Sequence, residues 1–486
     1  MDVVARTTGP RRGPLFALAL LLLAAGCEAD RPAPAAAPAP TPGAAPAPAS
    51  RAEAPAERPA KAASPPTKVL VVGTDGFDPV QVRRLVARGA MPNLQKLMQE
   101  GSSGTLFSER EIRSPALWTT LATGRPREVH GIYDFVTGSR LWPADRCDEP
   151  RRLVTSNMRA VPAIWNLASD AGLTVGVVGW LSTWPAEEVH GVMVSPYVAL
   201  GQKKQHTIKG GLYADEDRQV YPEARWDEIK QYIVSPFSLK DSEVEKVVPR
   251  APDDLAALYP RLRRYREAAR WSIAHTRTMR NTVLGLLETE QPDLTMVFVE
   301  GADSLGHRFW LFSQPNEQIE AQLADAGLPT GHAGRLSELY GEVIDRYYTI
   351  VDDMLRELLD QVDDDTLIMV ISDHGFGSRT GQWELNTQVP FEGEHRIEGF
   401  IALRGPGVKA GAKIHGATLY DIVPTIIDAL GMEDLEDGEG VSVLPSLEVA
   451  EESEPRAAAG PAELEPLDSS FDAEEVERLR SLGYVQ

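Results

Sequence analysis

Four short segments far apart in the chain carry carboxylate and imidazole side chains in combinations that suit divalent cations. The candidate ligands are Asp75, Asp303, His307, Asp373, His374 and His395. Carboxylate oxygen and imidazole nitrogen together suit zinc and, less strongly, manganese or iron. Two cations held side by side can clamp the attacking and leaving oxygens of a phosphoryl transfer. The set therefore predicts a two-metal phosphoryl-transfer site.

A further segment, around Ser114, offers a hydroxyl nucleophile. A hydroxyl is a weak nucleophile at neutral pH, and coordination to a divalent cation activates it. Ser108, Thr119 and Thr120 are rival candidates for this role. We expect Thr119 and Thr120 instead to begin a helix that runs toward Thr123, which leaves Ser114 as the preferred nucleophile.

Taken singly, these residues have ordinary structural interpretations. Asp75 can cap a turn at the end of a strand, and Asp303 and His307 can be turn and surface residues. Their joint occurrence favours a metal site, because three acidic residues follow three apolar runs and two of them have a histidine within four residues. The other histidines fit structural roles; they are His130, His190, His206, His275, His332 and His415.

Apolar runs that alternate with helical patterns indicate the fold class. Strands are predicted at residues 68–73, 173–179, 294–299, 366–371 and 399–403. Helices are predicted at 83–101 with one break, 163–171, 252–287 and 343–362. Strands that are apolar throughout indicate a sheet covered on both faces. The prediction is an α/β fold with a mostly parallel central sheet, helices on both faces, and ligands at the carboxyl ends of the strands.

The two ends of the chain are predicted to lie outside this fold. Residues 1–27 combine a basic start, an apolar run and small residues before Cys27, which is typical of a secretory signal. Residues 28–66 hold eleven of the 37 prolines, so we expect a disordered tether. Residues 448–486 are predicted to be an acidic linker and a short C-terminal helix.

The remaining residues, 67–447, are predicted to form one catalytic domain. Within it, residues 188–293 interrupt the alternation of strands and helices, which predicts an insertion that caps the strand ends. The formal net charge of −22 argues against a nucleic-acid-binding surface. A small phosphorylated substrate remains compatible with that charge, because bound cations dominate the field inside a metal site.

The candidate segments also resemble a known family in their order along the chain. Gly73–Gly76, Ser114, Asp303 with His307, Asp373–Gly375 and His395 resemble the type I phosphodiesterase/nucleotide pyrophosphatase branch of the alkaline phosphatase superfamily. Residues 419–425 resemble the helix near that superfamily's C-terminal end, so the resemblance extends over about 68–444.

The resemblance implies two metal ions, most simply zinc. The implied ligands of the first ion are Asp303, His307 and His395, and those of the second are Asp75, Asp373, His374 and the Ser114 oxygen. It also implies a phosphodiester substrate and a phosphoryl-serine intermediate on Ser114 that water then hydrolyses.

One departure from the family concerns phosphate binding. Nucleotide pyrophosphatases place an asparagine shortly after a His-Gly-Ile sequence, whereas His130–Ile132 is followed here by Tyr133, Asp134 and Phe135. This weakens the assignment to nucleotides. Phosphomonoester, phosphonate and sulfate ester hydrolysis on the same scaffold stay open, although Ser114–Ala116 does not match the pattern of formylglycine sulfatases. A mutase-like relative and a catalytically dead binding protein are further alternatives.

Two other features have paired interpretations. The small residues before Cys27 resemble a bacterial lipobox, which implies lipidation of that thiol and attachment to a bacterial membrane on its periplasmic or cell-surface side; an ordinary cleaved signal is the alternative. If Cys27 is lipidated, Cys147 has no partner.

Five aromatic residues near the predicted strand ends either pack in the core or stack on an aromatic leaving group; they are Trp180, Trp184, Tyr197, Phe309 and Trp310.

Overall fold

The computed structural model describes residues 68–198, 217–377, 393–433 and 438–444. A nine-stranded sheet forms the centre, with strand order β11-β2-β10-β7-β1-β6-β3-β4-β5. Its strands are β1 Val69–Thr74, β2 Ser102–Phe107, β3 Val175–Val178, β4 Gly191–Val194, β5 Val220–Tyr221, β6 Leu294–Val299, β7 Leu367–Ile371, β10 Glu398–Arg404 and β11 Lys413–Thr418. A separate two-stranded ribbon pairs β8 Gly375–Gly377 with β9 Glu394–Arg396.

The sheet is mostly parallel, as the apolar runs predict. Strand β1 lies between β6 and β7 and is parallel to both. Strand β10 runs antiparallel to its two neighbours, β7 and β2, and the edge strand β5 runs antiparallel to β4. The carboxyl ends of β1, β6 and β7 therefore meet at one edge of the sheet.

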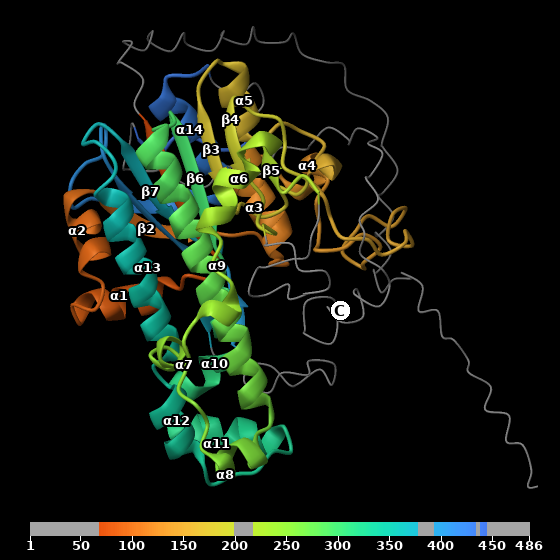
Figure 1. Cartoon of the computed structure of the whole chain (residues 1–486), viewed down its shortest axis with the longest axis vertical. Helices are drawn as coiled ribbons and strands as arrows, with labels where there is room; N and C mark the ends of the chain where they lie inside the picture. Colours follow the sequence, from red (N-terminus) through yellow and green to blue (C-terminus); the bar gives the residue numbers. More distant parts are fainter. Residues whose placement is uncertain (1–67, 199–216, 378–392, 434–437, 445–486) are drawn as a thin grey trace, which may run out of the picture.

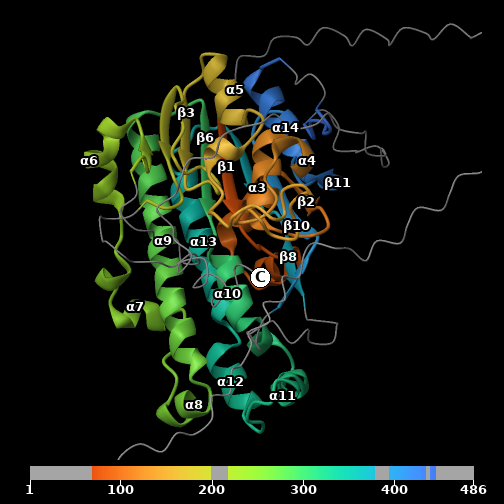
Figure 2. The ribbon, with the colours of Figure 1, turned by 90° about the vertical axis from the view of Figure 1, so that its right-hand side faces the viewer.

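Helices cover both faces of the sheet. They are α1 Pro79–Ala87, α2 Pro92–Glu100, α3 Ser114–Thr123, α4 Arg127–His130, α5 Ile164–Asp170, α6 Trp226–Ile229, α7 Asp241–Glu245, α8 Asp253–Leu258, α9 Arg261–Thr289, α10 Gly301–Phe309, α11 Asn316–Asp325, α12 Ala333–Tyr340, α13 Val343–Leu359 and α14 Ile422–Leu430. In Figures 1 and 2, α9 and α13 lie on one side of the strands, and α3, α5 and α14 lie on the other.

Alternating residues of the central strand β1 pack into two hydrophobic cores, one on each face of the sheet. Leu70 and Val72 of β1 join the apolar cluster formed with α1, α2, α9 and α13. Val69 and Val71 join the second cluster, with α3, α5 and α14. Because side chains alternate across a strand, a run that is apolar at every position buries both faces.

The segment 188–293 differs from the predicted cap. Its strand β4 pairs with β3 inside the central sheet, and β5 pairs with β4. Its long helix α9 packs on β6 and β3 and supplies much of one core. These strands are only four and two residues long, which is too short for a periodic pattern to identify them. Part of the predicted insertion therefore belongs to the main fold.

The far end of α9 carries a helical extension. Helices α8, α11 and α12 lie beyond the sheet in both views (Figures 1 and 2). Helix α8 ends at Leu258, and α9 begins at Arg261, so the helical stretch predicted over 252–287 is interrupted once. No helix of the described residues has the length and apolar content needed to cross a bilayer.

Several predictions fall outside the described residues, among them the secretory signal, the tether, Cys27 and the C-terminal helix. Cys147 is buried in the structure. The expectation for its thiol depends on lipidation of Cys27, which lies outside the described residues.

Candidate metal centre

Three strands place the acidic residues at one edge of the sheet. Asp75 follows β1 directly, and its backbone N–H donates to the carbonyl of Val299, the last residue of β6 (3.0 Å). The backbone N–H of Asp303 in turn donates to the carbonyl of Asp75 (2.9 Å). Asp373 follows β7 after one intervening residue, Ser372. These bonds hold the chain segments that carry the carboxylates against one another.

The histidines reach this edge from three different elements. His307 lies one helical turn after Asp303 on α10, so the two side chains share a face of the helix. His374 precedes β8, and His395 lies in β9, opposite Phe376 of the ribbon. The Phe376 ring contacts the His395 ring edge to face, with centroids 5.1 Å apart. The ribbon therefore brings His395 back to the sheet edge.

The first cluster consists of Asp303, His307 and His395. The Asp303 Oδ1 atom lies 3.1 Å from His307 Nε2 and 3.1 Å from His395 Nε2. The two Nε2 atoms are 2.9 Å apart. Ligand atoms bound at 2.0–2.1 Å to a tetrahedral zinc lie roughly 3.3 Å from one another. These three separations are close to what a cation between the side chains requires.

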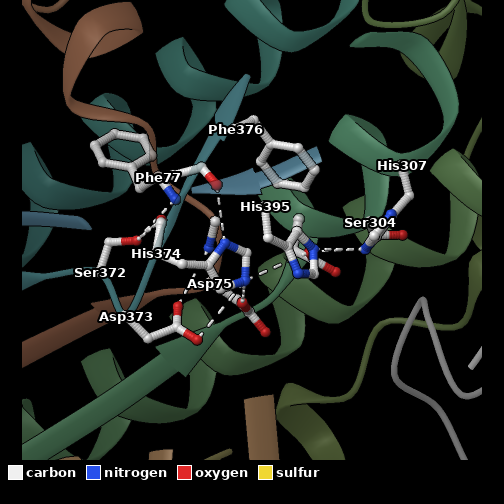
Figure 3. Close-up of polar contacts among 12 residues, drawn as sticks. Asp75, Phe77, Ser304, His307, Ser372, Asp373, His374, Phe376 and His395 are labelled. Carbon is white, nitrogen blue, oxygen red and sulfur yellow. Dashed lines mark hydrogen bonds and ion pairs between the residues drawn. The ribbon is translucent and has the colours of Figure 1, made fainter. Parts of the chain in front are cut away.

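The second cluster consists of Asp75, Asp373 and His374 (Figure 3), whose ligand atoms lie within 4.8 Å of one another. His374 Nε2 is 3.2 Å from Asp75 Oδ1 and 3.8 Å from Asp373 Oδ2. The same nitrogen is 3.8 Å from Asp303 Oδ1, so His374 lies between the two clusters. The structure thus brings together all six predicted protein ligands in two adjoining groups.

The electrostatics of the second cluster favour a cation. Asp373 and His374 are fully buried, and Asp373 Oδ2 has no hydrogen-bond partner among the described residues. Burial, and then the Asp75 carboxylate, raise the pKa of Asp373 well above its ordinary value. Burial lowers the pKa of His374, but Asp373, Asp75 and Asp303 outweigh it and raise this pKa to about 10.

The pKa of His395, in the ribbon, is shifted in the opposite direction to that of His374. Burial, and then the nearby His374, lower the pKa of His395 well below its ordinary value. An imidazole that stays neutral keeps its lone pair for a metal ion. Three buried carboxylates and a neutral imidazole form a donor set that a pair of divalent cations fits, since cations would compensate the mutual repulsion of the carboxylates.

Ser114 lies at the same site. It lines one pocket together with Asp75 and Asp303, and it is the first residue of α3. Helix α3 therefore begins earlier than the predicted start at Thr119, because Pro115 is favourable in the first helical turn. The first N–H groups of a helix attract anions, so a phosphoryl group beside Ser114 would meet a favourable helix end.

The other candidate hydroxyl groups either form hydrogen bonds elsewhere or do not line the pocket. Thr119 donates to the carbonyl of Pro115 within α3 (2.6 Å). Thr120 donates to Glu109 Oε1 (3.2 Å) and contacts His130 Nε2 (3.1 Å). Ser108, which follows β2, is absent from the residues that line the pocket. The geometry therefore favours Ser114 over Ser108, Thr119 and Thr120.

A buried network supports the helix that carries Ser114. Glu109 accepts hydrogen bonds from Arg127 Nη2 (2.7 Å), Thr120 and the Tyr420 hydroxyl (2.9 Å). The Arg127 side chain is only 6% exposed. His130 lies against Thr120, and burial lowers its pKa to about 3. The structural role assigned to His130 is confirmed, because it packs in this network behind α3.

The segment that follows His130–Ile132, where the resemblance leads one to look for an asparagine, carries Asp134 and Phe135. Asp134 is buried, and its Oδ1 accepts from the N–H of Phe135 (2.9 Å). Arg113, which precedes Ser114, lies 4.0 Å from the same oxygen. Phe135 lines the pocket, whereas Asp134 is not among the lining residues.

A small pocket lies beside Ser114. Its wall comprises Asp75, Ser114, Phe135, Leu181, Pro196, Tyr197, His275, Phe298, Glu300 and Asp303. Of the five aromatic residues singled out in the sequence, Tyr197 lines this pocket. Trp180 and Phe309 are core residues, and Trp310 stacks on Phe376 with ring centroids 5.6 Å apart. Core packing is thus the better interpretation for most of that set.

The sequence patterns missed two polar residues of this wall. His275 was assigned a structural role, and Glu300, between β6 and α10, carried no motif. The only signal for Glu300 is its place at the carboxyl end of β6. His275 lies in the middle of the long helix α9, where its spacing from other residues indicates nothing about the pocket.

The fold and the two ligand clusters define a hydrolase of the alkaline phosphatase superfamily, whose members use divalent metal ions. The sequence matches the type I phosphodiesterase/nucleotide pyrophosphatase family over residues 69–452, so the chain belongs to that family. The family and fold expected from the sequence are therefore confirmed.

Similarity to individual proteins is more distant. The chain is 34% identical over 116 residues to a choline-sulfatase of Rhizobium meliloti (strain 1021), and this match spans 22% of each protein. Among solved structures it is similar to a 2-O GAG sulfatase (12% identity, 80% of this chain and 76% of the other, TM-score 0.45). It is also similar to a phosphonate monoester hydrolase of Silicibacter pomeroyi (15% identity, 80% and 78%, TM-score 0.41).

Proposed function

We propose that this protein is a two-metal phosphodiesterase that acts through Ser114. The observation that carries the proposal is the position of Ser114, at the start of α3, in the same pocket as Asp75 and Asp303 of the two ligand clusters. Family membership supports phosphoric ester chemistry. The lack of a formylglycine-type sequence at Ser114 argues against a sulfatase, although sulfatases are among the similar proteins.

The proposed ligands keep the division that the resemblance implies. Asp303, His307 and His395 would hold one ion, and Asp75, Asp373, His374 and the Ser114 oxygen would hold the other. Zinc suits this set best, with manganese or iron as alternatives. Such ions would supply Lewis-acid stabilisation of the phosphoryl oxygens and make the Ser114 hydroxyl more acidic.

The chain's own groups would then perform the following steps. Ser114 Oγ attacks phosphorus in line and forms a new P–O bond, while the bond to the leaving alcohol breaks on the opposite side. The N–H groups at the start of α3 stabilise the charge on the phosphoryl group. Water then cleaves the phosphoryl-serine and regenerates the hydroxyl. The pocket beside Ser114 holds the organic part of the ester.

A substrate panel with matched variants tests this proposal. Methyl p-nitrophenyl phosphate, p-nitrophenyl phosphate, p-nitrophenyl sulfate and a phosphonate monoester report on the four ester classes. We expect the diester to have the highest kcat/KM. Ser114→Ala should retain metal and melting temperature and lose turnover by roughly three orders of magnitude or more. Thr119→Ala, whose hydroxyl bonds within α3, is the control.

Three outcomes would contradict the proposal. Preferred turnover of the sulfate or phosphonate would place the protein with another activity of the superfamily. Wild-type turnover by Ser114→Ala would move the nucleophile to another residue. Absence of turnover of any ester by the fully metal-loaded protein would support the catalytically dead binding protein.

We also propose export and lipid attachment through Cys27, on the basis of the sequence that precedes this residue. Residues 28–66 would then separate the domain from the membrane. Mass spectrometry of the N-terminal peptide from the native host would detect a diacylglyceryl thioether at Cys27. An unmodified thiol, or a mature terminus elsewhere, would contradict lipidation.

A further inference from the structure

His275 of α9 is a buried residue whose surroundings a structural role does not fully explain. Its side chain is 1% exposed, and it lines the pocket that also contains Ser114, Asp75 and Asp303. Its Nδ1 atom has no hydrogen-bond partner among the described residues. A buried polar atom without a partner is costly, and a ligand in the pocket would satisfy it.

The protonation state of the imidazole follows from its one partner. His275 hydrogen-bonds the backbone of Pro196, and a proline backbone offers only its carbonyl oxygen. The ring therefore donates from Nε2. Burial lowers the pKa of His275 to about 4, so the ring is neutral at neutral pH. A neutral ring that donates from Nε2 has an acceptor lone pair on Nδ1.

The remaining wall has the composition of a cation-binding pocket. Phe135, Tyr197 and Phe298 contribute aromatic rings, and Glu300 contributes a carboxylate. Aromatic faces attract cations through the ring quadrupole, and the attraction increases when the cation is desolvated. No lysine or arginine is among the residues that line the pocket. Within the described part of the chain, this wall therefore favours a positively charged group over a second anion.

We propose that the pocket binds the protonated amino group of an aminoalkyl phosphoester, with His275 Nδ1 accepting one of its N–H hydrogens. This inference rests on the proposed phosphodiesterase function, because it places the phosphoryl group at Ser114 and the organic substituent in the pocket. A trimethylammonium group carries no N–H and cannot satisfy Nδ1. The pocket therefore distinguishes aminoethyl esters from their choline counterparts, although both are cations.

The first experiment compares three p-nitrophenyl diesters that differ only in the second substituent: 2-aminoethyl, 2-(trimethylammonio)ethyl and ethyl. We expect kcat/KM for the aminoethyl ester to exceed that for the ethyl ester by roughly ten- to a hundredfold, the worth of a hydrogen bond from a charged donor. The trimethylammonio ester should fall between them. Equal values for the aminoethyl and trimethylammonio esters would overturn the inference.

Variants then assign the preference to His275. His275→Leu removes the acceptor with a side chain of similar size, and His275→Gln retains a side chain that can accept. The ratio of kcat/KM for the aminoethyl ester to that for the ethyl ester should fall about tenfold or more in His275→Leu and recover in part in His275→Gln. His415→Leu, at an exposed position of β11, is the matched control.

The ratio separates this inference from simpler explanations. A variant that only perturbs packing lowers both activities together and leaves the ratio unchanged, which would overturn the role of His275. If the wild type cleaves none of the three diesters, the proposed function fails. If it cleaves all three at similar rates, the function stands and the pocket assignment fails.

The aminoalkyl phosphoester can be a soluble molecule or a lipid headgroup. Glycerophosphoethanolamine and vesicles that contain phosphatidylethanolamine present the same chemistry from these two sources. Cleavage of either one in preference to its choline counterpart supports the inference, and the faster of the two identifies the source. Preference for the choline compound in both arms would overturn it.

Discussion

Replacement of Asp373 by asparagine should raise the stability of the metal-free protein at neutral pH and lower that of the metal-loaded protein, each relative to the wild type. Folding raises the pKa of this carboxyl, first through burial and then through Asp75. An acid whose pKa is raised by folding contributes stability while protonated, and that stability is lost as pH rises from the unfolded pKa toward the folded one. In chelator, the wild type should therefore lose stability as pH rises from about 4 to neutrality. Asp373→Asn cannot ionise and should lose less.

Bound cations reverse this effect, because they compensate the ionised carboxylate. A ligand present at 100 times its Kd stabilises the folded state by about 2.7 kcal/mol. The unfolding entropy is about 2.1 cal/mol/K per residue, or roughly 0.7 kcal/mol/K for a domain of about 350 residues. Each ion should then raise Tm by about 4 °C, and two ions by about 8 °C. Asp373→Asn should retain about half of this metal-induced increase in Tm.

The assay is thermal unfolding at pH 5 and pH 8, first in chelator and then with excess zinc. Asp352→Asn provides the control. Asp352 is also buried, but its oxygens accept from Leu94 N (2.8 Å) and Asn93 Nδ2 (2.7 Å). Its replacement should lower Tm with or without metal and leave the zinc-induced increase intact.

One result would refute this role of Asp373. If Asp373→Asn melts below the wild type in chelator at pH 8 and still gains the full increase with zinc, then Asp373 is neither a repelled carboxylate nor a ligand. The second cluster would then need to be assigned without it.

Three further predictions concern the ligands and their supports. His307→Ala should reduce bound zinc from two ions toward one by elemental analysis; unchanged content would exclude it as a ligand. Gly306→Ala places a Cβ 2.7 Å from the Phe376 ring, so overpacking by about 1–3 kcal/mol should weaken zinc binding in calorimetric titration, and wild-type affinity would argue against this packing role. Glu109→Leu should cost about 3–5 kcal/mol in urea unfolding, because Arg127 stays buried without its carboxylate. The double variant Glu109→Leu/Arg127→Met should recover most of that loss, and failure to recover would exclude the unpaired charge as its cause.

The sequence predicted those parts of the fold where one signal dominates. Strands β1, β6 and β7 are uninterrupted apolar runs, and their predicted bounds agree with the structure to within about a residue. The sequence did not indicate β2, because Ser102 and Ser103 are buried polar residues that satisfy no apolar pattern. The antiparallel direction of β10 was also not predictable, since direction depends on pairing between distant segments.

The same contrast applies to the site. The convergence of the candidate ligands was predictable, because the carboxyl ends of parallel strands meet at one end of a sheet. The position of His374 between both clusters was not predictable, because it depends on side-chain distances of 3.2 and 3.8 Å. His275 was missed for a similar reason: a helix residue shows its function only through what packs across from it.

The ribbon that carries His395 has a consequence for how the protein would retain metal ions at the candidate site. Strands β8 and β9 are three residues each, and a two-stranded unit of that size has little stability of its own. An ion held by His395 of the ribbon and by Asp303 and His307 of α10 would therefore link these two elements. Release of the metal and detachment of the ribbon would then occur together. The packing of Phe376 on Trp310 would then influence metal retention without any change in the coordinating atoms.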